Sequence, residues 1–200
     1  MSFKKNNYEI VKKAISKELS LFLTEYILLK RKVAKVVIDK GIIVPGYPLF
    51  GSFGDTQVPN AYNHYADIAM EVLLKNLKTT LEKVTKINLV ETYSYMRIYS
   101  NGDELKRHKD RPSCEISTTL NLGGDSWPIF VKSLNKEIEI NLSPGDMLIY
   151  KGCELEHWRN PFKGKECVQV FLHYNQKDGE FNNLYDGRDF LGLPTKSLNE

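Results

Sequence analysis

The spacing of hydrophobic residues predicts two helices in the first part of the chain. Residues 8–38 carry apolar side chains near helical spacing, with lysines between the earlier ones. A second segment, from about residue 61 to residue 84, repeats this pattern and places its lysines on another face. The stretch between them, GYPLFGSFGDTQVPN, is rich in glycine, proline and aromatic residues. We expect it to be a long ordered loop, and such loops often carry function.

After residue 86 the period shortens to the alternation typical of β-strands. LVETYSYMRIY alternates, and the strand-like runs CEISTTLNL, PIFVKSL, EIEINL, MLIYKG and CVQVFLHY follow, separated by turn signals such as GGDSW and SPGD. We predict an α+β, mainly β, fold: a double-stranded β-helix (a cupin-like jelly roll) with the N-terminal helices packed outside. Residues 1–200 would form a single domain, with helical support and a long loop in 1–88, the β core in 89–176 and a C-terminal tail in 177–200.

Composition and charge narrow the class of protein only slightly. A hydrophobic content of 42% with 26% charged residues is typical of a globular protein, and the formal charge of +3 gives a weak attraction to polyanions. The first residues lack the apolar core of a signal peptide, and residues 21–29 are too few and too close to charges to cross a bilayer. Three cysteines without metal-ligand spacing fit reduced thiols. We therefore expect a cytoplasmic protein without membrane contact.

His108 and Asp110 are the first candidate metal ligands. They stand two residues apart in the word HKD. In an extended segment such residues project to the same face, so both side chains can reach one ion. A surface histidine and aspartate at a strand end would give the same pattern. The pair therefore indicates a metal site only if a third ligand is present.

His157 is the candidate for that third ligand. It follows the segment LSPGDMLIYKGCELE, which predicts a turn, a strand and a short loop. A jelly roll brings distant strands side by side, so a late histidine can complete a site begun by His108 and Asp110. Two imidazoles and one carboxylate leave half of an octahedron open, as in the non-haem iron(II) oxygenases. Zinc is chemically possible with the same ligands.

Lys165 is a candidate for binding an anion behind the metal. It stands at the start of the expected strand 166–174 and by alternation shares a face with Cys167 and Gln169. An inward cation is costly unless it meets an anion, and a dicarboxylate that chelates the metal would present its second carboxylate there. Two alternatives stay open: Lys165 faces solvent as part of the charged turn FKGKE, or Lys163 takes the role although it lies further from the strand.

Taken together, the motifs resemble the prolyl 4-hydroxylase-like branch of the iron(II)/2-oxoglutarate-dependent dioxygenases, over roughly residues 91–175. In that branch an aromatic residue precedes the H-x-D pair, and a lysine followed by a bulky aromatic comes after the distal histidine. The words HKDRPSCEIS, WPIFV and EHWRNPF also resemble uncharacterised dioxygenases of marine bacteria and their phages. The residues that carry the family resemblance are Tyr99, His108, Asp110, Pro144, Gly145, Asp146, His157, Lys165 and Phe171.

The resemblance implies a reaction and a set of roles. Iron(II) would be bound by His108, Asp110 and His157. 2-Oxoglutarate would chelate it, with the far carboxylate on Lys165 and the Tyr99 hydroxyl beside it. An unidentified substrate would be hydroxylated with release of succinate and CO2, and ascorbate is a candidate reductant. A peptidyl proline, a free amino acid or another small metabolite all fit as substrate.

Two departures from the family pattern concern the cofactor lysine and the substrate mouth. Lys165 follows the distal histidine sooner than is usual, so we expect a shortened turn at NPFKGK. The family's glycine-rich word is here GGDSWPIF, which borders the substrate mouth and bears on the substrate more than on the reaction class.

Three further residues are candidates for substrate contacts. Arg111 and Arg159 each follow a ligand closely, and they either bind substrate or orient Asp110; solvent-facing arginines are an equal alternative. Arg159 is also a rival of Lys165 for the far carboxylate. Trp127 would wall the pocket or belong to the core.

Other classes of function stay open. A cupin-like metal protein without oxygen chemistry would keep the three ligands but need no buried lysine, whereas a non-catalytic interaction domain would lack the ligands. A nucleic-acid demethylase on the same scaffold would need a basic groove with stacking aromatics. It ranks lower, because the lysines lie mainly on the front helices. We expect a small-molecule or peptide substrate and no nucleic acid or membrane partner. The sequence does not indicate the oligomeric state.

Overall fold

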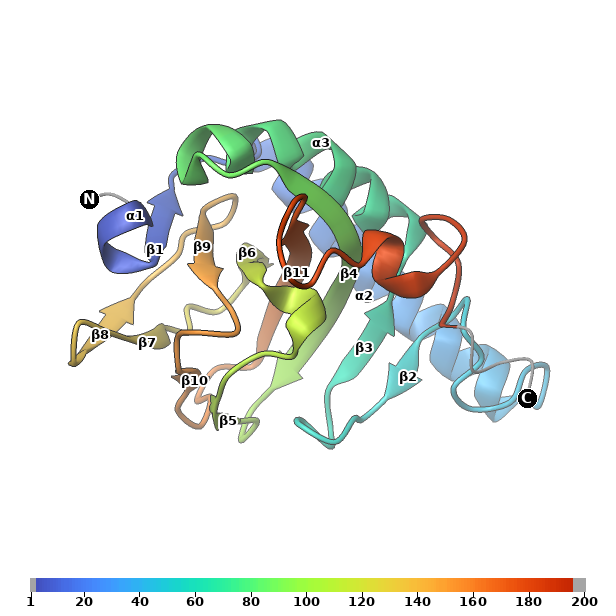
Figure 1. Ribbon diagram of the computed structural model, residues 1–200. Coiled ribbons are helices and arrows are strands. Elements are labelled where there is room, and N and C mark those ends of the chain that lie inside the picture. Colours follow the sequence, from blue (N-terminus) through green and yellow to red (C-terminus); the bar gives the residue numbers. More distant parts are fainter. Residues whose placement is uncertain (1–2, 196–200) are drawn as a thin grey trace.

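The computed structural model describes residues 3–195, so the ends of the expected helical support (1–2) and of the C-terminal tail (196–200) lie outside it. Its β-strands are flanked by two long helices (Figure 1). The elements, in chain order, are α1 (Phe3–Asn6), β1 (Tyr8–Val11), α2 (Lys17–Asp39), β2 (Ser52–Phe53), β3 (Tyr62–Tyr65), α3 (Ile68–Thr85), β4 (Leu89–Ser100), β5 (Leu105–His108), η1 (Pro112–Cys114), β6 (Ile116–Gly124), β7 (Ile129–Ser133), β8 (Lys136–Ile140), β9 (Met147–Lys151), β10 (His157–Arg159), β11 (Glu166–Gln176) and η2 (Leu184–Gly187).

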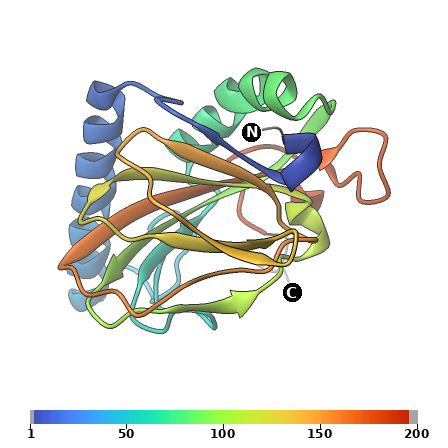
Figure 2. The same cartoon turned by 90° about the vertical axis from the view of Figure 1, so that its left-hand side faces the viewer.

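The strands form two antiparallel sheets. The larger sheet has seven strands in the order β1-β9-β6-β11-β4-β3-β2, and the smaller has four in the order β5-β10-β7-β8. Neighbouring strands come from distant parts of the chain, as where β11 lies between β6 and β4. The long helices stand outside the sheets (Figure 2). This is a jelly-roll-like arrangement, and the predicted fold class is confirmed.

Both long helices begin at a residue that caps them. The Ser16 side chain accepts a hydrogen bond from the amide of Leu19 at the start of α2, and Asp67 accepts from the first amides of α3. The two helices pack on the outer face of the larger sheet, where Leu23, Ile27 and other apolar side chains meet its outward residues. The apolar spacing that predicted these helices is therefore the spacing of their buried faces.

The expected helical segments were too long at their N-terminal ends. Residues 8–11 form the edge strand β1, which pairs with β9, and residues 62–65 form β3, which pairs with β4. Asn7, Lys13 and Ala66 have positive φ, which a helix does not allow. Asn7 precedes β1, Lys13 lies between β1 and α2, and Ala66 lies between β3 and α3, so each long helix begins only after such a residue. Tyr8 then packs between the two sheets.

Alternation along β4 separates the helix side of the larger sheet from the inside of the barrel. Met96 and Ile98 join the core beneath α2 and α3. Tyr93, Tyr95 and Arg97 line an internal cavity. The inside of the barrel is thus unusually polar along this strand, which is where a site is expected.

The strands β5 and β10 were not anticipated, because they are only four and three residues long. No period can be recognised over so few residues. Their pairing nevertheless places the two ligand-bearing segments side by side, with His157 opposite His108.

The C-terminal tail is fixed to the β core rather than separate from it. Arg188 donates hydrogen bonds to the Glu71 carboxylate of α3 and to the Thr92 carbonyl of β4, and both charged side chains are almost fully buried. Within residues 3–195, none of the helices combines the length and the apolar character that a membrane span needs.

Candidate metal centre

The three expected ligands meet where β5 and β10 run side by side. His108 is the last residue of β5, and His157 is the first residue of β10. Asp110 lies in the loop after β5, where its amide donates to the carbonyl of Gly152 at 2.9 Å. The structure therefore brings together residues that are far apart in the sequence.

The ligand atoms are close enough to share one ion. The Nε2 atoms of His108 and His157 lie 3.5 and 3.4 Å from the same Asp110 oxygen, Oδ1. One ligand atom from each residue falls within 4.8 Å of the other two. Two imidazole nitrogens and one carboxylate oxygen on one side of an ion form the arrangement of a facial triad.

Backbone carbonyls orient both imidazole rings. Nδ1 of His108 lies 2.7 Å from the carbonyl oxygen of Lys106, and Nδ1 of His157 lies 3.0 Å from that of Leu155. A nitrogen in this position donates its proton to the carbonyl, so Nε2 keeps its lone pair for a metal. Both rings are thus held in the tautomer that a metal ligand requires.

Asp110 is held in its charged form. Burial alone would raise its pKa, but the neighbouring imidazoles of His108 and His157 hold that pKa well below its usual range. Its second oxygen accepts from the Ser117 hydroxyl at 2.7 Å, and Ser117 also lies 3.0 Å from Nδ1 of His173. Burial lowers the pKa of His173 to about 4, so this neighbour stays neutral.

The close approach around Asp110 requires a glycine at position 152. A Cβ on Gly152 would lie 2.4 Å from Oδ2 of Asp110, 2.3 Å from the Cys114 carbonyl and 2.5 Å from Oγ of Ser117. Any larger residue would push Asp110 out of line with the histidines.

A cavity of about 430 Å³ opens in front of the three ligands. A second cavity, of about 440 Å³, adjoins it and shares Thr56, Gln57, Leu105 and His108 with its lining. The first is lined by Asp55, Thr56, Gln57, Tyr93, Tyr95, Arg97, Leu105, His108, Lys109, Asp110, Arg111, Cys114, Ile129, Tyr150, His157, Phe171 and His173.

An ion pair between Arg97 and Asp55 forms one wall of this cavity. Arg97 is almost fully buried, donates to the Asp55 carboxylate, and reaches the Tyr99 hydroxyl at 3.1 Å. Asp55 also accepts from the Tyr95 hydroxyl at 2.7 Å. The segment 46–60, which was expected to be a long ordered loop, contains the short strand β2, and its Asp55 attaches it to the β core at the site.

Arg111 lies at the mouth of the cavity and is bound by the C-terminal tail. Its guanidinium donates to both oxygens of Asp186, at 2.9 and 2.6 Å, and lies over the ring of Tyr93. It lines the cavity as expected of a substrate-binding residue, while most of its hydrogen-bonding capacity is directed to Asp186.

Arg159, two residues after His157 on β10, lies between the two sheets and outside the cavity lining, in a group of buried side chains that we call the floor of the barrel. It is 1% exposed and donates to the Trp127 carbonyl, to Oγ1 of Thr119 at 3.3 Å and to Oε1 of Gln169 at 3.4 Å. Its Nε atom is buried without a hydrogen-bond partner, and no carboxylate of residues 3–195 is paired with its guanidinium. A buried cation with only neutral partners is rare in a protein interior.

The prediction that Lys165 points into the barrel is wrong. Lys165 is exposed and stands in a bend before β11, where its amide donates to the Asp125 carboxylate at 2.6 Å. Inward alternation begins only within the strand, at Cys167, so it does not extend back to Lys165. Lys163 is exposed as well, and of the three cations considered for this role only Arg159 lies inside the barrel.

Tyr99 and Trp127 belong to the floor rather than to the cavity wall. Tyr99 is fully buried and packs against Trp127, with ring centroids 4.7 Å apart. The indole nitrogen of Trp127 donates to the Asn160 carbonyl at 2.8 Å, and Arg159 lies over its ring. The expected substrate contact of Trp127 and Arg159 therefore has no support in their positions.

Several contributors to the site, among them Asp55, Arg97 and Asp186, were missed in the sequence. Arg97 alternates with Tyr95 and Tyr99 on β4, so the period that predicted the strand also placed it on the inner face. Asp186 had no such signal, because its contact with Arg111 joins two irregular segments.

A second group of metal-binding side chains shares Asp110 with the first. Its other members are Cys114 and His173. Burial raises the pKa of the Cys114 thiol, which lies 3.0 Å from the Tyr93 hydroxyl. A thiol that stays protonated is a poor ligand, so the two-histidine group fits a metal better.

Solved structures share this fold, whereas no protein-family model and no curated protein matches the sequence. A prolyl-4-hydroxylase of Pseudomonas putida is similar over 87% of this chain and 95% of its own, with a TM-score of 0.64 and 13% identity. EctD from S. alaskensis with 2-oxoglutarate and 5-hydroxyectoine gives a TM-score of 0.63 and 13% identity over 92% and 76% of the two chains. HygX from Streptomyces hygroscopicus, with nickel and 2-oxoglutarate bound, gives 0.60 and 8% over 88% and 85%.

Proposed function

We propose that this chain is an iron(II)- and 2-oxoglutarate-dependent oxygenase that hydroxylates its substrate. The observation that carries the proposal is the convergence of His108, Asp110 and His157 on one point, with both Nε2 atoms beside the same carboxylate oxygen. The likeness to structures whose names include 2-oxoglutarate supports the same reaction class.

The donor set fits iron(II). Neutral imidazoles and a carboxylate suit this ion, and three protein ligands leave positions for a chelating cosubstrate and for dioxygen. Hydrogen bonds to Nδ1 of each histidine and to the second oxygen of Asp110 already fix all three side chains. His108, Asp110 and His157 would hold the metal without rearrangement of their surroundings.

Arg159 fits the far carboxylate of 2-oxoglutarate. Its guanidinium has only neutral partners within residues 3–195, and it follows the ligand His157 by two residues along β10. A carboxylate there would receive charge-assisted hydrogen bonds in a site shielded from water. The Thr119 hydroxyl and the Gln169 amide lie within reach of the same position, and Tyr99 packs beside it.

When bound, iron(II) and 2-oxoglutarate would reduce dioxygen, with one oxygen atom leaving in succinate, the other entering the substrate as a hydroxyl, and CO2 released. The side chains of the cavity position the substrate and exclude water. Tyr150, Ile129 and Phe171 line it beside the triad. Such an enclosure holds the target C–H bond near the metal and limits side reactions.

Two substrate classes are consistent with the proposed reaction: a peptidyl proline and a small metabolite. The similar structures include a prolyl-4-hydroxylase and an EctD structure that holds 5-hydroxyectoine, so they support both. The adjoining second cavity gives room for a substrate that extends past His108.

The proposal is tested by iron binding and succinate release. Purified protein with iron(II), ascorbate, dioxygen and labelled 2-oxoglutarate should form succinate slowly without added substrate, and His157→Ala should abolish both this and tight iron(II) binding. His64→Gln, which changes a buried histidine outside the cavity, is the matched control and should retain both. Wild-type protein that binds zinc but forms no succinate would instead indicate a metal-binding protein without oxygen chemistry.

A further inference from the structure

The outer face of α2 carries a stripe of exposed apolar side chains. Phe22 is 65% exposed, Leu29 62%, Val36 50% and Val33 39%. Residues 22, 29 and 36 repeat every two turns, so they lie on one line along the helix, opposite the face that packs on the sheet. Isolated apolar residues on a surface need no explanation, but an aligned group on a helix is typical of an interaction surface.

Charged residues of opposite sign flank the two halves of this stripe. Glu18 and Glu25 lie in the N-terminal half, and Lys32 and Lys40 lie at the other end; all four are exposed. Within residues 3–195 none of the four is in an ion pair. The helix dipole favours Glu18 and Lys40 near the ends, but it does not account for Glu25 and Lys32 in the middle.

We propose that a second copy of this chain packs on the stripe, with the two α2 helices antiparallel about a two-fold axis near Leu29. This places Phe22 of one copy against Val36 of the other, so the same patch serves both chains. In the antiparallel arrangement Glu25 of each copy lies beside Lys32 of the other. Parallel helices would instead bring like charges together, so the charge pattern selects both the partner and its direction.

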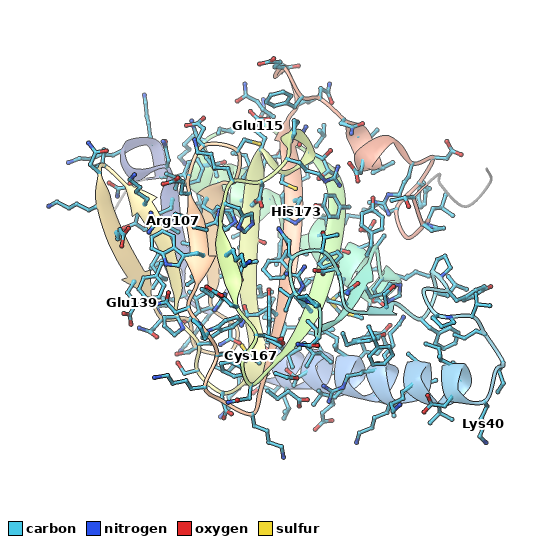
Figure 3. All side chains as sticks on the ribbon, turned by 90° about the horizontal axis from the view of Figure 1, so that it is seen from below. Lys40, Arg107, Glu115, Glu139, Cys167 and His173 are labelled. Carbon is cyan, nitrogen blue, oxygen red and sulfur yellow. The ribbon has the colours of Figure 1, made fainter. Side chains whose placement is uncertain are left out.

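The position of α2 leaves the candidate active site free in such a dimer. α2 crosses the strands near the end of β11 that holds Cys167, with Lys40 projecting at its far end, whereas His173 lies toward the other end of β11 (Figure 3). Since His173 lines the cavity of the metal ligands, this part of the cavity lies away from α2. The inference therefore stands apart from the proposed function.

The size of the surface sets the expected strength of the dimer. The 23 residues of α2 give a helix about 34 Å long. A pairing through one helix from each chain lies at the low end of interface sizes, below about 1,200 Å², where association is reversible. We expect a monomer–dimer equilibrium that shifts with protein concentration.

Sedimentation velocity of the full-length protein over a concentration series tests the dimer. The wild type should shift from monomer to dimer, and Leu29→Glu, which places two carboxylates at the axis, should raise the dissociation constant by about a hundredfold or more. Val72→Glu is the matched control, because Val72 is 53% exposed on α3. It should leave the equilibrium unchanged, and circular dichroism should show both variants folded.

Charge exchange tests the antiparallel direction. Glu25→Lys and Lys32→Glu should each weaken the homodimer by about tenfold, because each creates two like-charge contacts. The double variant should recover the wild-type equilibrium, and an equimolar mixture of the two single variants should form a heterodimer.

Several outcomes would overturn the proposal. A protein that stays monomeric at all concentrations, or a dimer unaffected by Leu29→Glu, would exclude this interface. Loss of dimer in both single variants without recovery in the double variant would exclude the antiparallel pairing. A monomer that co-sediments with phosphatidylcholine vesicles through Leu29 would assign the stripe to a lipid surface instead.

Discussion

Arg159 and Arg188 are both buried, but they meet different partners. Arg188 pairs with the Glu71 carboxylate at 3.0 Å, and its remaining nitrogens donate to backbone carbonyls. Among the residues that the structure describes, Arg159 donates only to a carbonyl, a hydroxyl and an amide oxygen, and its Nε atom has no partner. The charge of the Arg188 guanidinium is therefore balanced by a carboxylate, whereas the charge of the Arg159 guanidinium is not.

The contrast indicates that Arg188 has a structural role, whereas Arg159 is able to bind an anionic ligand. A buried ion pair is part of the fold, and removal of one member leaves the other charge unpaired. A buried cation with neutral partners raises the free energy of the ligand-free protein. Binding of an anion that fits beside the cation lowers this free energy again. Burial lowers the pKa of Arg159 for the same reason.

Arg188→Met should have the largest effect on stability. It leaves the Glu71 carboxylate buried without its cation, which costs about 3–5 kcal/mol of unfolding free energy. Urea denaturation followed by circular dichroism measures the loss. Adding Glu71→Gln should recover part of it, although Glu71 also accepts from Ser94 and Gly192. Unchanged stability in the single variant would show that the tail is not held by this pair.

Arg159→Met should act on ligand affinity instead. We expect the anaerobic iron(II) protein to bind 2-oxoglutarate about tenfold more weakly or worse, because a charge-assisted contact is worth about 1.5–3 kcal/mol. Iron(II) binding should stay intact, and the apoprotein should lose no more than about 1 kcal/mol of stability. The charge-transfer band of the iron–2-oxoglutarate complex reports the affinity directly.

Lys165→Ala is the matched control for that titration. Lys165 is exposed, so its removal should leave the affinity for 2-oxoglutarate unchanged. If Lys165→Ala weakened the binding and Arg159→Met did not, the anchor would lie in the turn before β11 and the comparison of the two arginines would fail.

His64 shows a third way of burying an ionisable group, and we expect the smallest effect from it. Burial lowers its pKa to about 4, with the nearby charges of Lys30 and Asp67 acting in opposite directions. The unfolded chain takes up this proton near pH 6.5 and the folded chain does not. His64 should therefore account for a fall of about 1 kcal/mol in stability between pH 6.5 and pH 5.5, in addition to any contribution from His173. His64→Gln should remove this part of the pH dependence; an identical slope in both proteins would contradict the assignment.

The fold could be predicted from the sequence wherever a period extends over enough residues. The strand-like runs from LVETYSYMRIY onward correspond to the strands β4, β6, β7, β8, β9 and β11, and the two helices were located by their apolar faces. β1 and β3 were assigned to helices, since four residues beside a helical pattern do not show their own period. Their identity depends on pairing with β9 and β4, which only the folded chain supplies.

The same reasoning explains which parts of the site were predictable. The two-residue spacing of His108 and Asp110 is a local rule, and the jelly roll supplies His157 from a distant segment. The rule failed at Lys165, because alternation holds only inside a strand and the chain bends before β11. Asp55 and Asp186 come from irregular segments, and no local pattern indicates which strand such a segment will contact.

The central position of β11 constrains the order in which the chain can fold. Residues 166–176 lie between β4 and β6 in the middle of the larger sheet, yet they are synthesised only after both of those strands. Until then β4 and β6 each present an unpaired edge, which is a template for pairing with other chains. Long-range pairings of this kind also make folding slow. We therefore expect nascent chains that stop before residue 166 to bind chaperones or aggregate, and the full sheet to form only after residue 176 has been synthesised.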